Sequence, residues 1–179
     1  MRESARFWLI FLCLAACLVV AWSLLPHDAF YTVDSGIKYA QVESLLRHRF
    51  TTTALDYPGG DIDPRGAISP FRLEPLVYLK DGKGYSVFPI YFPALSALFV
   101  ALLGPAGLFV LPLSAGLGTA LLLGRLARRW LPSGWSLLAM AAGLLCTPLF
   151  FYAQTFWEHA PTTALTLAAV APLLRAHDR

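Results

Sequence analysis

The stretch GYSVFPIYFPALSALFVALLGPAGLFVLPLSAGLGTALLLG, residues 84–124, decides the fold class because it contains no charged side chain. A helix that crosses a bilayer needs about 20 mostly apolar residues, so this run is long enough for one span and more. Arg125, Arg128 and Arg129 follow it directly. Because a dense cluster of basic residues prefers the cytoplasmic side, we expect the apolar run of residues 84–124 to end on the inner side of a membrane.

This apolar run fits two arrangements. It holds either two spans that turn at Gly104, or one span preceded by a helix that lies in the membrane plane or re-enters it. With the N-terminus inside and residues 27–83 outside, a single crossing by about residues 106–124 returns the arginines to the inner side. We therefore favour one crossing, with the segment around Pro89 and Pro93 packed against the membrane from the outer side.

The composition agrees with a membrane protein. The chain is 57% hydrophobic and 14% charged, with a mean hydropathy of +0.59. The net charge is only +3, and no basic run is interleaved with aromatic residues, which argues against a nucleic-acid partner. Three cysteines in apolar runs form neither a disulfide framework nor a metal pair, so we interpret Cys13, Cys17 and Cys146 as small packing residues.

Three further apolar runs predict three more spans. Residues 7–26 follow two arginines, which place the N-terminus in the cytoplasm. Residues 133–152 form the next span, with a kink expected at Pro148, and residues 160–174 form a last, slightly short one. The expected fold is an all-α polytopic membrane protein with about four transmembrane helices, built as a single membrane domain over residues 1–179.

A polar segment follows the first span and forms a loop outside the membrane. We assign residues 27–88 to this periplasmic loop, assuming a bacterial inner membrane. Within it, DSGIKYAQVESLLRHRF, residues 34–50, predicts an amphipathic helix on the membrane surface, because apolar residues recur at helical spacing. Asp34 or Ser35 is the expected N-cap. The recurring apolar residues are Tyr39, Val42, Leu46 and Phe50.

Polar side chains on the outer side carry the candidate chemistry. In TFWEHAPTT, residues 155–163, Glu158 and His159 stand between two apolar runs, on the same side as the periplasmic loop. A carboxylate at a helix start, near a second acidic or His group, has the parts for general-base catalysis or metal binding, and Asp34 is one such carboxylate. The simpler readings are an N-cap for Asp34 and interfacial polarity for the Glu-His pair. Basic residues of the loop have the chemistry to hold a phosphate.

The order of these features resembles the bacterial GT-C glycosyltransferases, the polytopic class that includes the protein mannosyltransferases and oligosaccharyltransferases. A first span leads to a large outer loop with an early acidic residue, in FYTVDSGIKYAQVESLLRHRF. The stretches YSVFPIYFPALSALFVALLG and LGTALLLGRLARRW resemble the segment ahead of that family's second span and the second span itself. LLCTPLFFYAQTFWEHAPTTALTL is similar to a third span, an acidic outer loop and a fourth span.

The resemblance implies transfer of a sugar from a polyprenyl-phosphate donor to an acceptor glycan, lipid or protein on the periplasmic side. The first-loop acidic residue of the family matches Asp34, which would deprotonate or orient the acceptor. Its second-loop acidic position matches Glu158, with His159 beside it. This Glu-His pair departs from the family's acidic motifs, so a divalent metal stays open and no cofactor is assigned. Membrane lipid is a further expected partner. The expected substrate-binding residues are Lys38, Arg65, Arg72 and Tyr91.

Members of this class are several hundred residues long and have many more spans. The resemblance therefore also implies that the chain is a fragment or a small relative without a full site. The competing interpretation is a non-catalytic membrane subunit, or part of a carrier for lipid-linked sugars. A carrier would more often place polar groups at mid-membrane, and the predicted spans are almost free of them.

Overall fold

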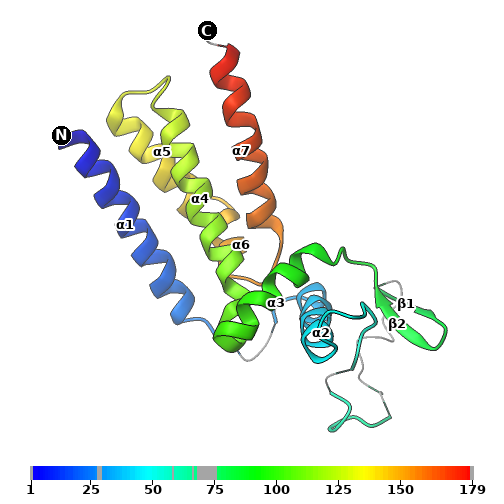
Figure 1. Ribbon diagram of the computed structural model, residues 1–179. Coiled ribbons are helices and arrows are strands. Elements are labelled where there is room, and N and C mark those ends of the chain that lie inside the picture. Colours follow the sequence, from blue (N-terminus) through cyan, green and yellow to red (C-terminus); the bar gives the residue numbers. More distant parts are fainter. Residues whose placement is uncertain (1, 28–29, 58, 66, 68–75, 178–179) are drawn as a thin grey trace. The chain divides into compact units, whose positions relative to one another are not determined.

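The computed structural model describes residues 2–27, 30–57, 59–65, 67 and 76–177 (Figure 1). The chain is mainly helical and divides into two compact units, which are described separately. The helical unit comprises Met1–Asp28 and Leu111–Arg179, and the mixed unit comprises Ala29–Val110.

Two helical segments are long and apolar enough to cross a membrane, Glu3–Ser23 and Tyr91–Ala127. Ser133–Leu145 and His159–Leu174 are apolar but shorter. The expectation of a helical chain with membrane-spanning segments is therefore met in its coarse form. The number of four spans stays a prediction.

The helices of the helical unit lie side by side and alternate in direction (Figure 1). The guanidinium carbon of Arg128 lies 4.0 Å from the ring centroid of Phe7, which joins the end of α4 to the start of α1. Ser133 Oγ donates to Glu3 Oε1 over 3.2 Å, and Arg129 Nη2 donates to the carbonyl of Leu174 over 3.2 Å. The arginine cluster and the N-terminus thus share one end. The elements are α1 (Arg2–Ser23), α4 (Val110–Ala127), α5 (Ser133–Leu145), α6 (Leu149–Ala153) and α7 (His159–His177).

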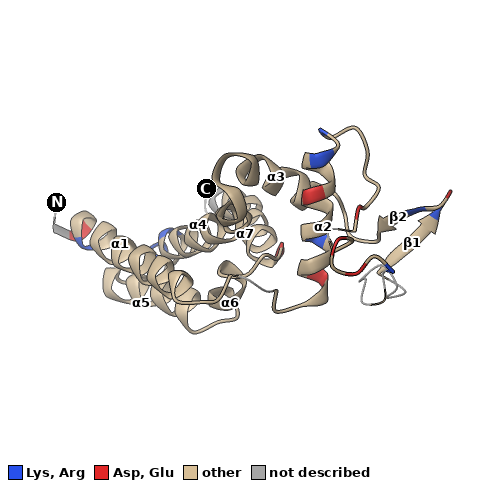
Figure 2. Cartoon of the chain, turned by 90° about the horizontal axis from the view of Figure 1, so that it is seen from below, with Lys and Arg blue, Asp and Glu red and all other residues tan. Residues whose placement is uncertain are grey.

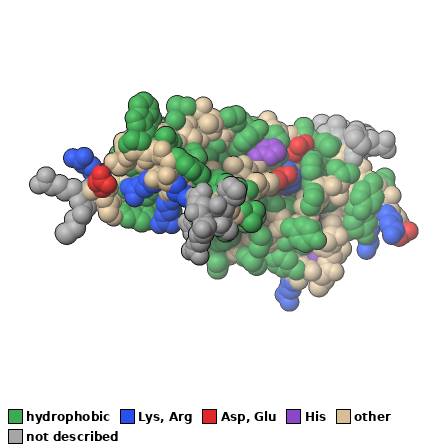
Figure 3. Space-filling view, turned by 90° about the horizontal axis from the view of Figure 1, so that it is seen from above, with side chains coloured by type: hydrophobic (Ala, Val, Ile, Leu, Met, Phe, Trp, Pro, Cys, Tyr) green, Lys and Arg blue, Asp and Glu red, His purple; other side chains and the backbone are tan. Residues whose placement is uncertain are grey.

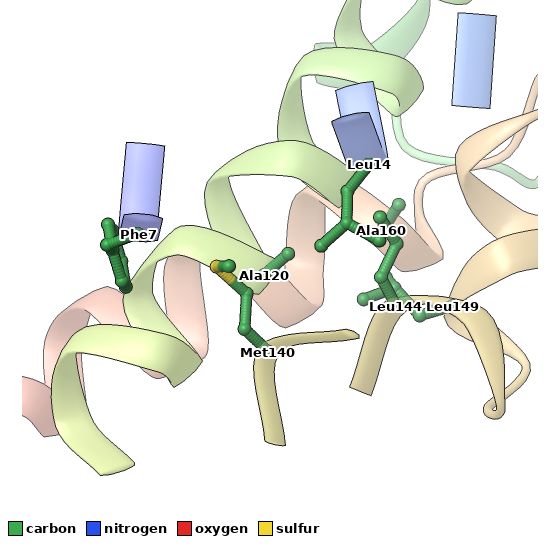
Figure 4. Close-up of a cluster of buried hydrophobic side chains, with 7 residues drawn as sticks. All are labelled: Phe7, Leu14, Ala120, Met140, Leu144, Leu149 and Ala160. Carbon is green, nitrogen blue, oxygen red and sulfur yellow. The ribbon is translucent and has the colours of Figure 1, made fainter. Parts of the chain in front are cut away.

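Buried side chains from every helix of this unit converge in one apolar cluster (Figure 4). Large apolar side chains also reach the surface of the same helices, such as Leu9, Leu12 and Leu165 (Figure 3). Charged positions lie near the helix ends and are missing from the helix middles (Figure 2). A helix that is apolar toward both core and surroundings is typical of a membrane span. The clustered residues are Phe7, Leu14, Ala120, Met140, Leu144, Leu149 and Ala160.

The cysteines do not contribute to this core. All three are exposed, so the interpretation of Cys13, Cys17 and Cys146 as packing residues was wrong. On an apolar helix surface a small polarizable thiol is tolerated because it matches an apolar environment. Their exposure also means that each must be replaced before a single cysteine is introduced elsewhere as a probe.

Small residues on α4 allow its neighbours to approach closely. Gly116, Ala120 and Gly124 recur every four residues and are all buried. A Cβ atom at Gly124 would lie 3.0 Å from the Cβ of Met140 and 3.1 Å from the Phe7 ring. This spacing of small residues on one face is how membrane helices commonly associate.

The predicted kink at Pro148 is confirmed, and it is a break rather than a bend. α5 ends at Leu145 and α6 begins at Leu149, so residues 133–152 form two helices instead of the single span expected. Pro148 has no N–H to donate into a continuing helix. The side chain of Thr147 compensates at the break: its hydroxyl donates to the Gly143 carbonyl over 2.7 Å and accepts from the Leu149 amide over 3.2 Å.

The mixed unit is built around α2 (Val33–Arg47), which packs against α3 (Tyr91–Leu103). The predicted helix over residues 34–50 is confirmed, but it stops at Arg47 because Arg49 and Phe50 have positive φ angles of 51° and 62°. The expected single apolar face was wrong. Phe50 lies beyond the helix and is exposed, while eight residues spread around the helix are buried, half of them polar. They are Ser35, Ile37, Lys38, Ala40, Gln41, Val42, Ser44 and Leu45.

A small antiparallel hairpin departs from the all-α expectation. β1 (Val77–Lys80) pairs with β2 (Lys83–Ser86) through the two-residue turn Asp81-Gly82, whose φ angles of 53° and 73° are both positive. Asp-Gly is one of the preferred sequences for such a turn. The Leu55 amide donates to the Gly84 carbonyl over 2.8 Å and ties the hairpin to the preceding segment.

The apolar run of residues 84–124 folds as α3, the 3₁₀ helix η2 (Gly104–Phe109) and α4. α3 has 13 residues and is about 20 Å long, short of a hydrocarbon core of about 30 Å, whereas the 18 residues of α4 give about 27 Å. α3 buries Pro93, Ser96, Ala97 and Val100 and exposes Tyr91, Leu95, Leu98 and Leu102. These lengths and the exposed apolar face support one crossing by α4 after a membrane-surface helix, which stays a prediction.

Candidate functional site

Asp34 lies in the first turn of α2, and Thr32 caps that helix. Thr32 Oγ1 accepts a hydrogen bond from the Ser35 amide over 3.3 Å and lies 3.0 Å from Ser35 Oγ. The prediction that Asp34 or Ser35 is the N-cap was therefore wrong. The Asp34 carboxylate is half-buried and, in the part of the chain that the structure describes, takes part in no hydrogen bond or ion pair. Since Thr32 performs the capping, this carboxylate is available for a ligand.

Lys38 follows Asp34 by one helical turn, so the two residues share a face of α2. The Lys38 side chain is only 1% exposed, and its Nζ lies 4.6 Å from the ring centroid of Phe88. Gln41 Nε2 donates to the Phe88 carbonyl over 3.2 Å, which holds Phe88 against the helix. Lys38 therefore reaches a ligand beside Asp34 only if its contact with the Phe88 ring opens.

The other predicted substrate-binding residues are less closely tied to Asp34. Tyr91 is the first residue of α3 and is 78% exposed. Arg65 is exposed in a turn of the irregular segment after α2. Arg72 lies outside the described residues. Their assignment to substrate binding stays a prediction.

Glu158 and His159 lie at the start of α7 in the helical unit. The Glu158 carbonyl accepts the Thr162 amide over 2.9 Å, so the helix begins at this pair. The His159 ring is exposed and contacts two aromatic rings, with centroid distances of 4.5 Å to Tyr152 and 4.6 Å to Trp157. An acidic residue at a helix start is favoured by the helix dipole. The pair thus combines a carboxylate, an imidazole and an aromatic surface.

The predicted catalytic residues are divided between the two units. Asp34 belongs to the mixed unit, and Glu158 and His159 belong to the helical unit. Within the helical unit, the end of α1, the start of α4 and the start of α7, which is His159, lie at one end, and the end of α4 lies at the other (Figure 1). A shared site with Asp34 stays a prediction.

A metal site is not completed by these residues. Among the described residues, no three His, Cys, Asp or Glu side chains group in a way that could hold a metal ion. Glu158 and His159 would supply two ligands at most, and a protein metal site usually takes three or more.

The mixed unit also contains a polar cleft that the sequence predictions did not select. It has a volume of about 650 Å³ and lies between the end of α2, residues 52–57 and the hairpin. His48 and Asp56 form its centre, with Nε2 and Oδ2 2.9 Å apart. In the sequence, Arg47 belongs to the predicted helix, whereas Asp56 and Lys83 follow in the loop. Their convergence depends on the hairpin, which was not predicted.

Comparisons with known proteins gave no match: neither a family model, nor a curated protein, nor a solved structure matches the chain. The function must therefore be inferred from the residues and their geometry.

Proposed function

We propose that this chain is a membrane-embedded glycosyltransferase, or part of one, that moves a sugar from a polyprenyl-phosphate donor to an acceptor on the periplasmic side. The observation that carries the proposal is the Asp34 carboxylate. Asp34 lies in the first turn of the buried helix α2, and Thr32, not Asp34, caps that helix. No described side chain neutralises the Asp34 carboxylate. A carboxylate carried on a helix and kept free of partners is available to act as a general base.

The proposed placement is a bacterial inner membrane with a cytoplasmic N-terminus and residues 27–88 in the periplasm. The shared end of the N-terminus and the arginine cluster supports it, because basic residues prefer the cytoplasmic side. α5 together with α6, which follows it after the break at Pro148, forms the third span of the proposed bundle, and α7 forms the fourth. Their apolar segments are shorter than α1, and snorkelling of flanking residues or local thinning of the bilayer accommodates such spans.

In the proposed reaction the acceptor hydroxyl attacks the anomeric carbon of the sugar. The new carbon–oxygen bond forms as the bond from that carbon to the phosphate oxygen breaks, and polyprenyl phosphate leaves with the electron pair. Asp34 takes the hydroxyl proton. Glu158 and His159 contribute a second carboxylate and an imidazole beside aromatic rings that offer flat apolar surfaces to a sugar.

The test is transfer of a radiolabelled hexose or pentose from polyprenyl-phosphate donors by the full chain in bacterial membranes. Asp34→Asn removes the base while leaving the Thr32 cap, so we expect transfer to fall by roughly 100-fold or more. Asp61→Asn is the matched control, since Asp61 is exposed in the same unit, and it should retain the wild-type rate. Glu158→Gln should also lower the rate.

Wild-type transfer by Asp34→Asn, at equal protein level, would contradict the catalytic role of Asp34. Absence of transfer by the unmodified chain with every donor would instead favour the non-catalytic subunit or carrier.

A further inference from the structure

The cleft at the end of α2 lies apart from Asp34. The rise of 1.5 Å per residue places Arg47, at the cleft, about 20 Å along the helix from Asp34. The cleft volume of about 650 Å³ falls within the usual range for small-molecule sites. Its polar lining combines residues from three elements: Arg47, His48, Thr52, Asp56, Tyr57 and Lys83.

Asp56 organises the charged side chains of the cleft. Its Oδ2 lies 2.9 Å from His48 Nε2 and 3.7 Å from Arg47 Nη1. Its own amide donates to Ser44 Oγ over 2.7 Å, and the Ser44 hydroxyl in turn donates to the Ala40 carbonyl over 2.7 Å. Because Ser44 is buried, Asp56 is anchored to α2, where it hydrogen-bonds His48 and lies within ion-pair distance of the more exposed Arg47.

The second basic wall of the cleft comes from the hairpin. Lys83 begins β2, immediately after the Asp81-Gly82 turn, and its ammonium pairs with no described carboxylate. The bond from the Leu55 amide to the Gly84 carbonyl fixes this strand beside the segment that carries Asp56. The cleft therefore combines two cations, Arg47 and Lys83, with one carboxylate, Asp56. Its net charge is +1 with a neutral His48 and +2 with a protonated His48.

From this arrangement we infer that the cleft binds the phosphate group of a phosphodiester. Asp56 occupies only one guanidinium nitrogen of Arg47, so the remaining donors of the planar fork can point to two oxygens of a phosphate. Lys83 adds a point charge from the opposite element, and the second ring nitrogen of His48 adds a donor when protonated. The inference does not rest on the proposed glycosyl transfer, although the sugar donor proposed there is itself a phosphodiester. The phosphodiester is either a phospholipid headgroup or a soluble ester, because both present the same singly charged group.

One local readout tests both sources in the full chain. The protein is placed in nanodiscs of neutral phosphatidylcholine with ¹³C-labelled histidine, and the His48 ring signal is assigned with His48→Gln. Glycerophosphoglycerol, a soluble phosphodiester whose charge does not change between pH 6 and 8, is then titrated at fixed pH. In parallel, the same signal is compared in nanodiscs of phosphatidylcholine and of phosphatidylglycerol.

Arg47→Gln and Lys83→Gln should each weaken binding by about three- to fivefold, the upper part of the effect expected of a partly exposed charge pair. The matched control is Lys80→Gln. Lys80 is the cross-strand partner of Lys83 and directly precedes the Asp81-Gly82 turn, so Lys80→Gln removes the same charge from the same hairpin, but Lys80 does not line the cleft. It should change the affinity by less than twofold.

If glycerophosphoglycerol shifts the His48 ring signal to saturation, and Arg47→Gln and Lys83→Gln each reduce that response, the result supports the site and a soluble ligand. A shift seen only with phosphatidylglycerol, with the same variant pattern, supports the site and a lipid headgroup. No His48 shift with either probe, or equal weakening by Lys80→Gln and Lys83→Gln, would overturn the inference.

Discussion

Gly116 of α4 and Ala153 of α6 approach so closely that a Cβ atom on Gly116 would lie 2.5 Å from the Cβ of Ala153. No side chain other than hydrogen fits between these backbones without displacement. The contact joins the middle of α4 to the short helix that follows the break at Pro148. It places a steric requirement for glycine at one position of the buried face of α4.

Gly116→Ala should destabilise the helical unit by about 1–3 kcal/mol, because the added methyl overpacks the contact with Ala153. Gly118→Ala is the matched control on the same helix, since a Cβ there meets no atom within 4 Å. It should be neutral, or stabilising by up to about 1 kcal/mol through helix propensity. Thermal unfolding followed by circular dichroism in detergent should separate the two by several degrees, and equal melting temperatures would refute the close contact.

Thr32→Ala should loosen the first turn of α2. Loss of an N-cap costs about 1 kcal/mol, which corresponds to roughly fivefold faster hydrogen exchange at the Ser35 and Gly36 amides. Asp34→Asn should leave these exchange rates near wild type, since the Asp34 side chain is not the cap. If Asp34→Asn accelerates exchange as much as Thr32→Ala, a loss of transfer in that variant would reflect a frayed helix instead of a missing base.

Glu43→Gln should lower the pKa of Tyr39. Burial raises the pKa of the Tyr39 hydroxyl above its ordinary value of 10.0, and the charge of Glu43 and a hydrogen bond to it raise it further. The protonated hydroxyl is thus favoured in the folded chain. Its contribution to stability is present below pH 10 and is lost as the pH rises through the folded-state pKa.

The measurement is a pH titration by NMR with ¹³C-labelled tyrosine, with Tyr39 assigned through Tyr39→Phe. Burial remains in Glu43→Gln, so the pKa should fall only part of the way to its ordinary value. Asp61→Asn, which changes a distant exposed carboxylate, should leave the titration unchanged. An identical Tyr39 curve in Glu43→Gln and wild type would show that Glu43 does not act on this hydroxyl.

The helices could be predicted from the sequence because local patterns determine them. Apolar runs gave α1, α4 and α7, and Pro148 gave the break after α5. The hairpin was missed although the sequence contains its turn residues, because Asp81-Gly82 was read as part of a long irregular loop. The small residues Gly116, Ala120 and Gly124 also carried a packing pattern that hydropathy alone does not reveal.

Site residues were harder to predict because their environment depends on contacts between distant segments. Nothing near Lys38 in the sequence indicates that Phe88 will cover it. The pairing of His48 with Asp56 requires the helix to end at Arg47 and the chain to reverse through two residues with positive φ. The sequence indicated Asp34 as a candidate for catalysis. Only the hydrogen bond from the Ser35 amide to Thr32 shows that Asp34 is not the N-cap of α2.

The most direct measurement asks whether the segment with Asp34 and the Glu158-His159 pair face the same side of the membrane. Cys13, Cys17 and Cys146 are replaced, and single cysteines are introduced as Asp61→Cys, His159→Cys and Gly134→Cys, all at exposed positions. Intact cells are treated with an impermeant thiol reagent, and permeabilised cells serve as the control. We predict that the first two variants label in intact cells and that Gly134→Cys labels only after permeabilisation. Labelling of Asp61→Cys without His159→Cys would put Asp34 and Glu158 on opposite sides and contradict a shared periplasmic site.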